Sequence, residues 1–230
     1  TQHLELSIKD IQSIQIECGP GSLDVFGAER SDRIKITATV KINGITQNRL
    51  QDFLDKHVLL SLKKRNRKAV LQSKFKNENL MKADAKIDLT VEVTKSLSVK
   101  IDDGSGSIFV NDLSTSLKIA DGSGSIEVRM TAGPVSVSDG SGKIELMDIT
   151  GNLEVKDGSG TINIERVRGN VHVVDGSGSM TIKDINGSLT VTDGSGSIEI
   201  SDVTQNVFIK DAGSGMLEIE GVKGKVVRRE

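Results

Sequence analysis

Aromatic side chains are almost absent from this chain of 230 residues, which contains no tryptophan, no tyrosine and only five phenylalanines. Proteins that hold sugars or nucleobases commonly stack them on aromatic faces. The composition therefore argues against a stacking platform of either kind. Cys18 is the only cysteine, so no intrachain disulfide can form. We expect it to be a small buried side chain rather than a reactive thiol.

The chain also lacks any apolar run close to the ~20 residues that a membrane-spanning helix needs. Its formal net charge is −2, so we expect no general attraction to nucleic acid or to anionic lipid. No secretion signal is visible, and a start at Thr1 fits a removed leader and a trimmed sequence equally well. Membrane association is expected only through a segment absent from this chain.

What the sequence does contain is a six-residue phrase, DGSGSI, that returns every eighteen residues. The phrase and its variants begin at Asp103, Asp121, Asp139, Asp157, Asp175 and Asp193. A last copy, DAGSGML, begins at Asp211 and is lengthened by Ala212. A fixed short period indicates that each unit is one supersecondary element, whose apolar side is buried by stacking on its neighbours.

Aliphatic and polar residues alternate after each phrase, which predicts a short strand with one face inward. Counted from the aspartate, position eight holds Val110, Val128, Leu146, Ile164, Ile182, Ile200 and, after the insertion, Ile219. A Gly-rich turn follows, as at Gly151-Asn152, and then a second strand. The inward pairs of this second strand are Leu117/Ile119, Val135/Val137, Leu153/Val155, Val171/Val173, Leu189/Val191 and Val207/Ile209.

Each unit is therefore strand, turn, strand, turn, which fits either antiparallel hairpins or one coil of a parallel β-helix. Six units of equal length favour the coil, because identical residues then stack in register at ~4.8 Å. A left-handed hexapeptide helix needs an aliphatic residue every six positions, and position five carries polar residues such as Ser107 and Lys143. We predict an all-β fold, a single-stranded parallel β-helix with 18-residue coils and right-handed winding.

The N-terminal third departs from the repeat, although the stretch from Cys18 to Val25 keeps a degenerate copy of the phrase. Helical spacing over Thr46–Val58 predicts a short helix that covers the first sheet edge. We predict one β-solenoid domain over 1–230. Its parts are opening strands or coils over 1–45, the capping helix over 46–58, irregular strands over 59–96 and regular repeats over 97–230.

The aspartates that open the units would form a ladder along one corner, where stacked carboxylates repel each other. The ladder would contain Asp103, Asp121, Asp139, Asp157, Asp175, Asp193 and Asp211. Each carboxylate could accept N–H bonds from the following residues in an Asx-turn. A row of calcium sites is the alternative, although the denser glycine pattern of calcium-binding repeats is absent.

Other candidate sites are few. A basic run from Lys63 to Lys76 has no acid between Leu60 and Asn77, and it fits either a solvated hairpin tip or a surface for lipid headgroups or a polyanionic glycan. The three histidines, His3, His57 and His172, are far apart in sequence and are expected to be surface or packing residues. The outward column at position sixteen is too mixed for an ice-binding face: Lys118, Ser136, Glu154, His172, Thr190 and Phe208.

Three features together carry a resemblance to a known family. They are the tandem strands with D-G-S-G-x-I turns, the helical insertion near Thr46–Val58, and the strand pattern from Leu89 to Ile101 that leads into GSGSI. Across nearly its whole length the chain resembles the bacterial "putative adhesin" domain of unknown function, a relative of the GIN-type autotransporter adhesin heads. The resemblance implies a β-solenoid that is exported or membrane-anchored in bacteria, and it brings no catalytic residues.

We therefore expect a non-enzymatic module of the cell surface or envelope, with a glycan or protein ligand and no cofactor. Self-association through the solenoid ends is a further expectation. An intracellular or periplasmic scaffold or polymerising protein is the alternative, and a carbohydrate-active β-helix enzyme is a third. No catalytic, cofactor-binding or metal-ligating residue is assigned from the sequence.

Overall fold

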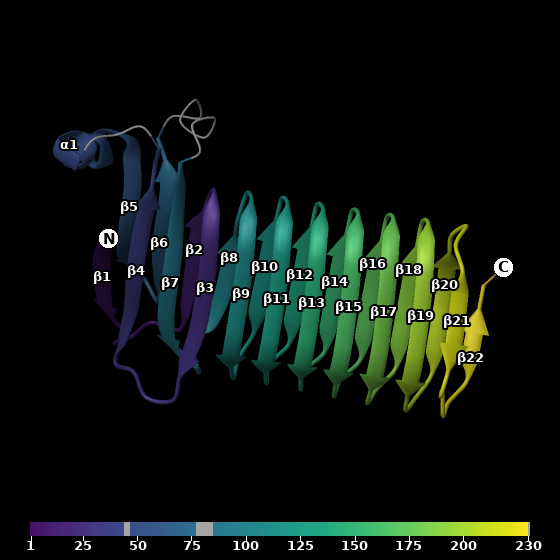
Figure 1. The fold of residues 1–230 in the computed structure, drawn as a ribbon. Coiled ribbons are helices and arrows are strands. Elements are labelled where there is room, and N and C mark those ends of the chain that lie inside the picture. Colours follow the sequence, from purple (N-terminus) through teal and green to yellow (C-terminus); the bar gives the residue numbers. More distant parts are fainter. Residues whose placement is uncertain (44–46, 77–84, 230) are drawn as a thin grey trace.

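The structure is a computed structural model that describes residues 1–43, 47–76 and 85–229. Two sheets of eleven strands each face one another along a rod (Figure 1). One helix, α1 (Gln47–His57), lies near the N-terminal end. Among the described residues, no helix has the length and apolar character needed to cross a bilayer.

The first sheet, called sheet A, has the following strands in spatial order: β1 (Gln2–Ser7), β4 (Arg33–Lys41), β7 (Lys86–Thr94), β3 (Gly21–Ala28), β9 (Gly106–Leu113), β11 (Gly124–Thr131), β13 (Gly142–Ile149), β15 (Gly160–Val167), β17 (Gly178–Ile185), β19 (Gly196–Val203) and β21 (Leu217–Glu220). Sheet B has, from the same end of the rod, β5 (Val58–Arg65), β6 (Lys68–Phe75), β2 (Ser13–Cys18), β8 (Ser98–Asp102), β10 (Leu117–Asp121), β12 (Val135–Asp139), β14 (Leu153–Asp157), β16 (Val171–Asp175), β18 (Leu189–Asp193), β20 (Val207–Ala212) and β22 (Val226–Arg228).

The repeats wind as coils of a β-solenoid, with one strand in each sheet per coil. Ile126 of β11 pairs in parallel with Ile144 of β13, and Val137 of β12 pairs in parallel with Val155 of β14. Each partner is one 18-residue unit away, so like residues stack on like at ~4.8 Å. The predicted parallel β-helix is confirmed, and the hairpin alternative is wrong.

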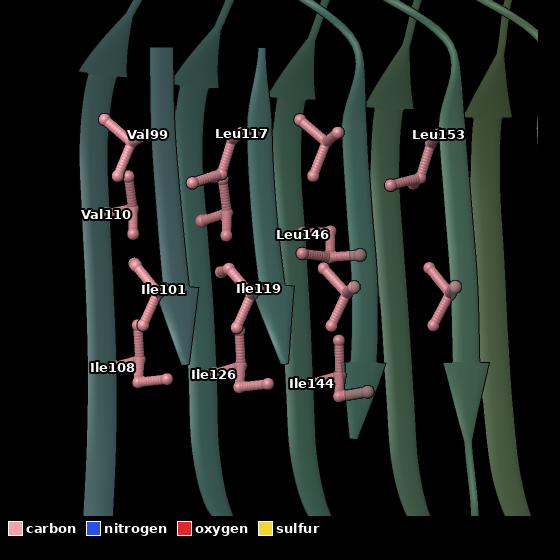
Figure 2. Packing of buried hydrophobic residues seen from close by; sticks show 14 of the residues in the cluster. Val99, Ile101, Ile108, Val110, Leu117, Ile119, Ile126, Ile144, Leu146 and Leu153 are labelled. Carbon is pink, nitrogen blue, oxygen red and sulfur yellow. The ribbon is translucent and has the colours of Figure 1, made fainter. Parts of the chain in front are cut away.

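The aliphatic columns of the two sheets meet inside the rod and form one continuous core. In Figure 2, Val99 and Ile101 of β8 point toward Val110 and Ile108 of β9. These four side chains are at most 2 % exposed. Because each fully buried Val or Ile contributes roughly 1.5–3 kcal/mol, the repeated columns provide the main stabilisation of the rod.

The second glycine of each DGSG phrase has a backbone that other residues rarely adopt. Gly160, for example, has φ +144°, and a Cβ built on it would overlap the carbonyl oxygen of Gly142 in the preceding coil. Glycine is therefore required here both by the dihedral angle and by the close approach of the coils.

Each long strand of sheet A between β9 and β19 also contains one non-glycine residue in the left-handed region, just before the last residue of the strand. These residues, with φ between 50° and 64°, are Asp112, Met130, Asp148, Arg166, Asp184 and Asp202. Aspartate tolerates this conformation better than most side chains. Met130 and Arg166 therefore adopt a left-handed backbone conformation that is unfavourable for methionine and arginine.

At the N-terminal end, spatial order departs from chain order. Strands β2 and β3 stack directly on the first regular coil, where Ile16 pairs with Ile101 and Gly21 with Gly106. Strands β6 and β7 lie outside them, although they come later in the sequence. Irregular strands were expected over 59–96, and β5, β6 and β7 lie in that part of the chain.

The end of the rod is formed by β1 and β5, which pair antiparallel with β4 and β6 and contact each other. The predicted helix is present as α1, and it lies beside the end of β5 rather than along the sheet edge (Figure 1). Its Phe53 and Leu54 pack against the core.

Candidate functional site

The aspartates that open the repeat units lie inside the rod. Their Cα atoms pair in register along sheet B from Asp121 to Asp193. The buried members, at 1–8 % exposed, are Asp121, Asp139, Asp157, Asp175 and Asp193. With half-buried Asp103 they form the acidic column.

The carboxylates of the acidic column are only partly hydrogen-bonded. The N–H groups of Gly104 and Gly122, each directly after its aspartate, donate to Asp103 (2.8 Å) and Asp121 (2.7 Å). The contact expected of an Asx-turn, from two residues on, is present at Asp175, which accepts the Ser177 N–H at 3.3 Å. Both carboxylate oxygens of Asp139, Asp157 and Asp193 are buried without a hydrogen bond of normal geometry. Such groups favour the protonated form.

Burial raises the pKa of all six carboxyls of the column. The carboxylates on adjacent coils add to this rise at Asp121, Asp157 and Asp175. The pKa reaches about 6 at Asp121 and at Asp157. Burial and the repulsion between stacked carboxylates therefore favour the protonated form of the column as the pH falls, and the nearby turn amides offset part of this rise in pKa.

The seventh aspartate does not belong to the column. The register of β18 and β20 shifts between Val191 and Thr192, so that Asp193 pairs with Ala212. Ala212 is buried in the inward position, while Asp211 is exposed and accepts the Gly213 N–H at 2.9 Å. The predicted seven-residue ladder is wrong at Asp211, because the inserted residue turns that side chain outward.

At its other end the column continues into Cys18. Glu17 pairs with Asp102, which places Cys18 beside Asp103. Burial, together with the negative charge and hydrogen bond of Asp103, raises the pKa of the Cys18 thiol. The thiolate, which is the nucleophilic form, is therefore disfavoured.

The acidic column does not assemble a metal centre. In the ranges 1–43, 47–76 and 85–229, no group of three or more His, Cys, Asp or Glu side chains is placed to hold a metal ion. Because the column is linear, each carboxylate faces only the two neighbours on adjacent coils.

The outer face of sheet B carries a continuous row of residues, here called the sheet B row. Pairing in register brings together residues from eight adjacent strands: Lys63, Val70, Gln15, Lys100, Lys118, Ser136, Glu154 and His172. Seven strand spacings of ~4.8 Å make the row roughly 34 Å long.

Two shallow grooves follow the sheet B row. The first has a volume of about 700 Å³ and crosses β10, β12, β14 and β16, with Lys118, Ser136, Glu154 and His172 along it. The apolar residues Leu117, Pro134, Val135, Leu153 and Val171 also line it. Four of its polar residues belong to the position-sixteen column, whose mixed composition argued against an ice-binding face, and the others are Ser116, Asn152 and Asn170.

The second groove, of about 560 Å³, lies over β2 and β6 and the β5–β6 turn. Arg65, Arg67, Lys68, Gln15 and Gln72 are among its lining residues. The basic run of the sequence thus forms one wall of a groove, and its residues 63–68 are all exposed. Sequence reasoning missed that both grooves lie on one face of sheet B, because β2, β5 and β6 are not consecutive in the chain.

The three histidines lie on separate elements. His3 of β1 contacts Thr37 at 3.2 Å, and His57 at the end of α1 packs against Phe53 with ring centroids 4.8 Å apart. His172 of β16 lies in the first groove.

Comparisons with known proteins identify solved structures with a similar fold. No family model and no curated protein matches the chain. A solved structure from Bacteroides fragilis, described as a "putative adhesin", is 13% identical with a TM-score of 0.50, over 99% of this chain and 96% of that one. A "putative adhesin" from Parabacteroides distasonis (16% identical, TM-score 0.40, 99% and 96% covered) and a "putative cell adhesion protein" from Clostridium sporogenes (9%, 0.34, 100% and 98%) are also similar. The first similarity shows the same fold, in agreement with the resemblance seen in the sequence.

Proposed function

We propose that this protein is a non-enzymatic binding module of the bacterial cell envelope or surface, and that it binds its ligand along the sheet B row. The observation that carries the proposal is the groove across four consecutive coils, in which Lys118, Ser136, Glu154 and His172 stand in register. A rigid core holds these side chains at fixed spacing. Such a surface suits an extended ligand that contacts several successive coils at once.

The mixed lining of the groove supports binding rather than simple solvation. Pro134 provides apolar surface in the groove beside charged, hydroxyl and amide side chains, while the side chains of Val135 and Leu153 point into the core beneath it. Binding sites commonly combine an apolar surface with a few polar groups that fix orientation. The description of the Bacteroides fragilis structure as a putative adhesin supports the same role.

The test is to block the groove without disturbing the core. Ser136 faces outward between buried Val135 and Val137, so we expect Ser136→Trp to fold normally and to fill the groove. Ser125 of β11 faces outward on the opposite sheet, and Ser125→Trp is the matched control. Any glycan or envelope protein captured by the wild type should be lost with Ser136→Trp and retained with Ser125→Trp, as measured by biolayer interferometry.

Equal binding by both variants would contradict the proposed surface. The location is tested separately, by mild proteolysis of intact cells followed by mass spectrometry of the repeat peptides. Release of these peptides before lysis is the expected result for a surface module. Protection until lysis would instead favour a scaffold inside the cell or in the periplasm.

A further inference from the structure

The charge of the outer face of sheet B changes along the rod. Cationic side chains gather at the N-terminal end, on β5, β6, β8, β10 and the β5–β6 turn: Lys63, Arg65, Arg67, Lys68, Lys100 and Lys118. Beyond Lys118 the row continues with Ser136, Glu154 and His172. We call the cationic part the basic track.

The carboxylates beside the basic track already interact with other side chains of the protein. Glu17 accepts the amide N–H groups of Gln15 (2.9 Å) and Gln72 (2.8 Å). Asp102 pairs with Lys100 at 2.7 Å and also accepts from Gln15 at 3.4 Å. Among the described residues, neither acid forms an ion pair with Lys63, Arg65 or Arg67.

Three cations of the β5–β6 hairpin, and Lys118 of β10, are available to a ligand. Within the part of the chain that the structure describes, Lys63, Arg65, Arg67 and Lys118 have no carboxylate within 4.0 Å. The side chain of Lys68 instead donates to Gln15 at 3.3 Å.

The outer face of sheet A has the opposite character. Glu127 and Glu145 are adjacent in one outward column there, as are Glu199 and Glu218. Cations of this sheet are paired with its own acids, for example Arg129 with Glu127, Lys143 with Glu145 (2.8 Å) and Lys183 with Glu165 (3.6 Å). We therefore expect an anion to be attracted more strongly to the N-terminal part of sheet B than to the outer face of sheet A.

We propose that the basic track binds a linear anionic polysaccharide, which carries carboxylate or sulfate groups and lies along the rod. This inference rests on the proposed function and names the ligand class of the same surface. Because the cations are spread over neighbouring strands, several charged sugars can be bound in succession. A small anion would use only one such contact and would bind weakly.

Neighbouring polar groups suit a sugar chain rather than a nucleic acid. Amide and hydroxyl side chains lie among the cations, including Gln12, Ser13 and Gln15 in the groove and the Ser98–Ser116 pair (3.1 Å) beside it. These groups can exchange hydrogen bonds with sugar hydroxyls. Among the described residues, no phenylalanine lines either groove, and the imidazole of His172 is the one ring there on which a base could stack.

The experiment compares two triple variants with equal loss of charge. Lys63→Ser/Arg65→Ser/Arg67→Ser removes three unpaired cations of the basic track, and Arg129→Ser/Lys143→Ser/Lys183→Ser removes three cations from sheet A. Binding to polygalacturonate and to a sulfated polysaccharide is measured by isothermal titration calorimetry at about 50 and 200 mM salt. Single-stranded DNA of matched charge and anionic lipid vesicles serve as competing probes.

We expect the track variant to lose affinity for the polysaccharides by about tenfold or more, and the sheet A variant to bind like the wild type. Affinity of the wild type should fall by more than about tenfold between the two salt concentrations, as expected when several ion pairs form. A polysaccharide affinity unchanged in the track variant would overturn the proposal. So would stronger binding of DNA or vesicles, because the occupant would then belong to another class.

A second variant tests the length of the track. Lys118 lies on β10, on the side of β8 away from the β5–β6 hairpin. Lys118→Ser should weaken binding of long chains more than binding of short oligomers that reach only the hairpin, and equal weakening of both would refute a continuous track. If no polyanion binds but another ligand is lost with Ser136→Trp, the ligand class is wrong and the proposed function stands.

Discussion

Because the carboxylates of the acidic column are buried, we predict that replacing one of them with a neutral side chain stabilises the folded protein. Asp157 is 7 % exposed, and both of its carboxylate oxygens lack a hydrogen bond of normal geometry. Burial, and the charges of Asp175 and Asp139, raise its pKa from the ordinary value of 3.8 to about 6. The substitution Asp157→Asn keeps the shape of the side chain and removes the charge.

The expected magnitude follows from the pKa. The rise from 3.8 to about 6 corresponds to roughly 3 kcal/mol at about 1.4 kcal/mol per pKa unit. Screening by water at the corner of the coil reduces this value, so we expect about 1–3 kcal/mol.

The sign follows from the direction of the shift. The folded state binds the proton more tightly than the unfolded chain does, so this contribution is fully present below pH ~4 and is lost as the pH rises to ~6. Above that pH the wild type carries the full cost of the buried charge. Asp157→Asn should therefore raise the free energy of unfolding at pH 7.5 and change it little at pH 4.5.

The assay is urea unfolding followed by far-ultraviolet circular dichroism at both pH values, since the chain has no tryptophan to report on folding. Asp211→Asn is the matched control, because Asp211 is exposed outside the column, and it should have no effect at either pH. Destabilisation by Asp157→Asn at pH 7.5 would show that the turn amides stabilise the carboxylate more than burial opposes it, and would refute the reasoning.

Two further substitutions test the backbone. Gly160→Ala should destabilise the coils around it by several kcal/mol, since the residue has φ +144° and the added methyl group would overlap the Gly142 carbonyl; a melting temperature equal to that of the wild type would contradict the stacking of the turns. Met130→Asn should raise the free energy of unfolding in urea by up to ~1 kcal/mol, because Met130 is 52 % exposed and has φ 50°, a conformation that asparagine tolerates better. Met147→Asn is the control, because Met147 lies at an outward position of β13 without positive φ, and it should not raise the free energy of unfolding.

Some of the acidic column could have been read from the sequence. Leu153, Val155 and Asp157 lie at alternating positions of one strand, so they share its inward face. The burial of Asp157 was not expected from the sequence, because a carboxylate usually lies at the surface unless it is paired. The column is buried because the DGSG turn folds the chain tightly over the end of the strand, and the adjacent coils cover each carboxylate.

The sequence by itself determined the coil, the register and the aliphatic core, because equal repeats place every column in stacked parallel strands. Only the tertiary structure decided where β5, β6 and β7 lie, because antiparallel strand pairing at the end of the rod joins segments without a repeating pattern. It also turned Asp211 outward at the inserted Ala212. Finally, it joined Gln15, Lys63, Lys100 and Lys118 in one row. Hydrogen bonding between strands that are distant in the chain created this surface, and no local pattern encodes such pairing.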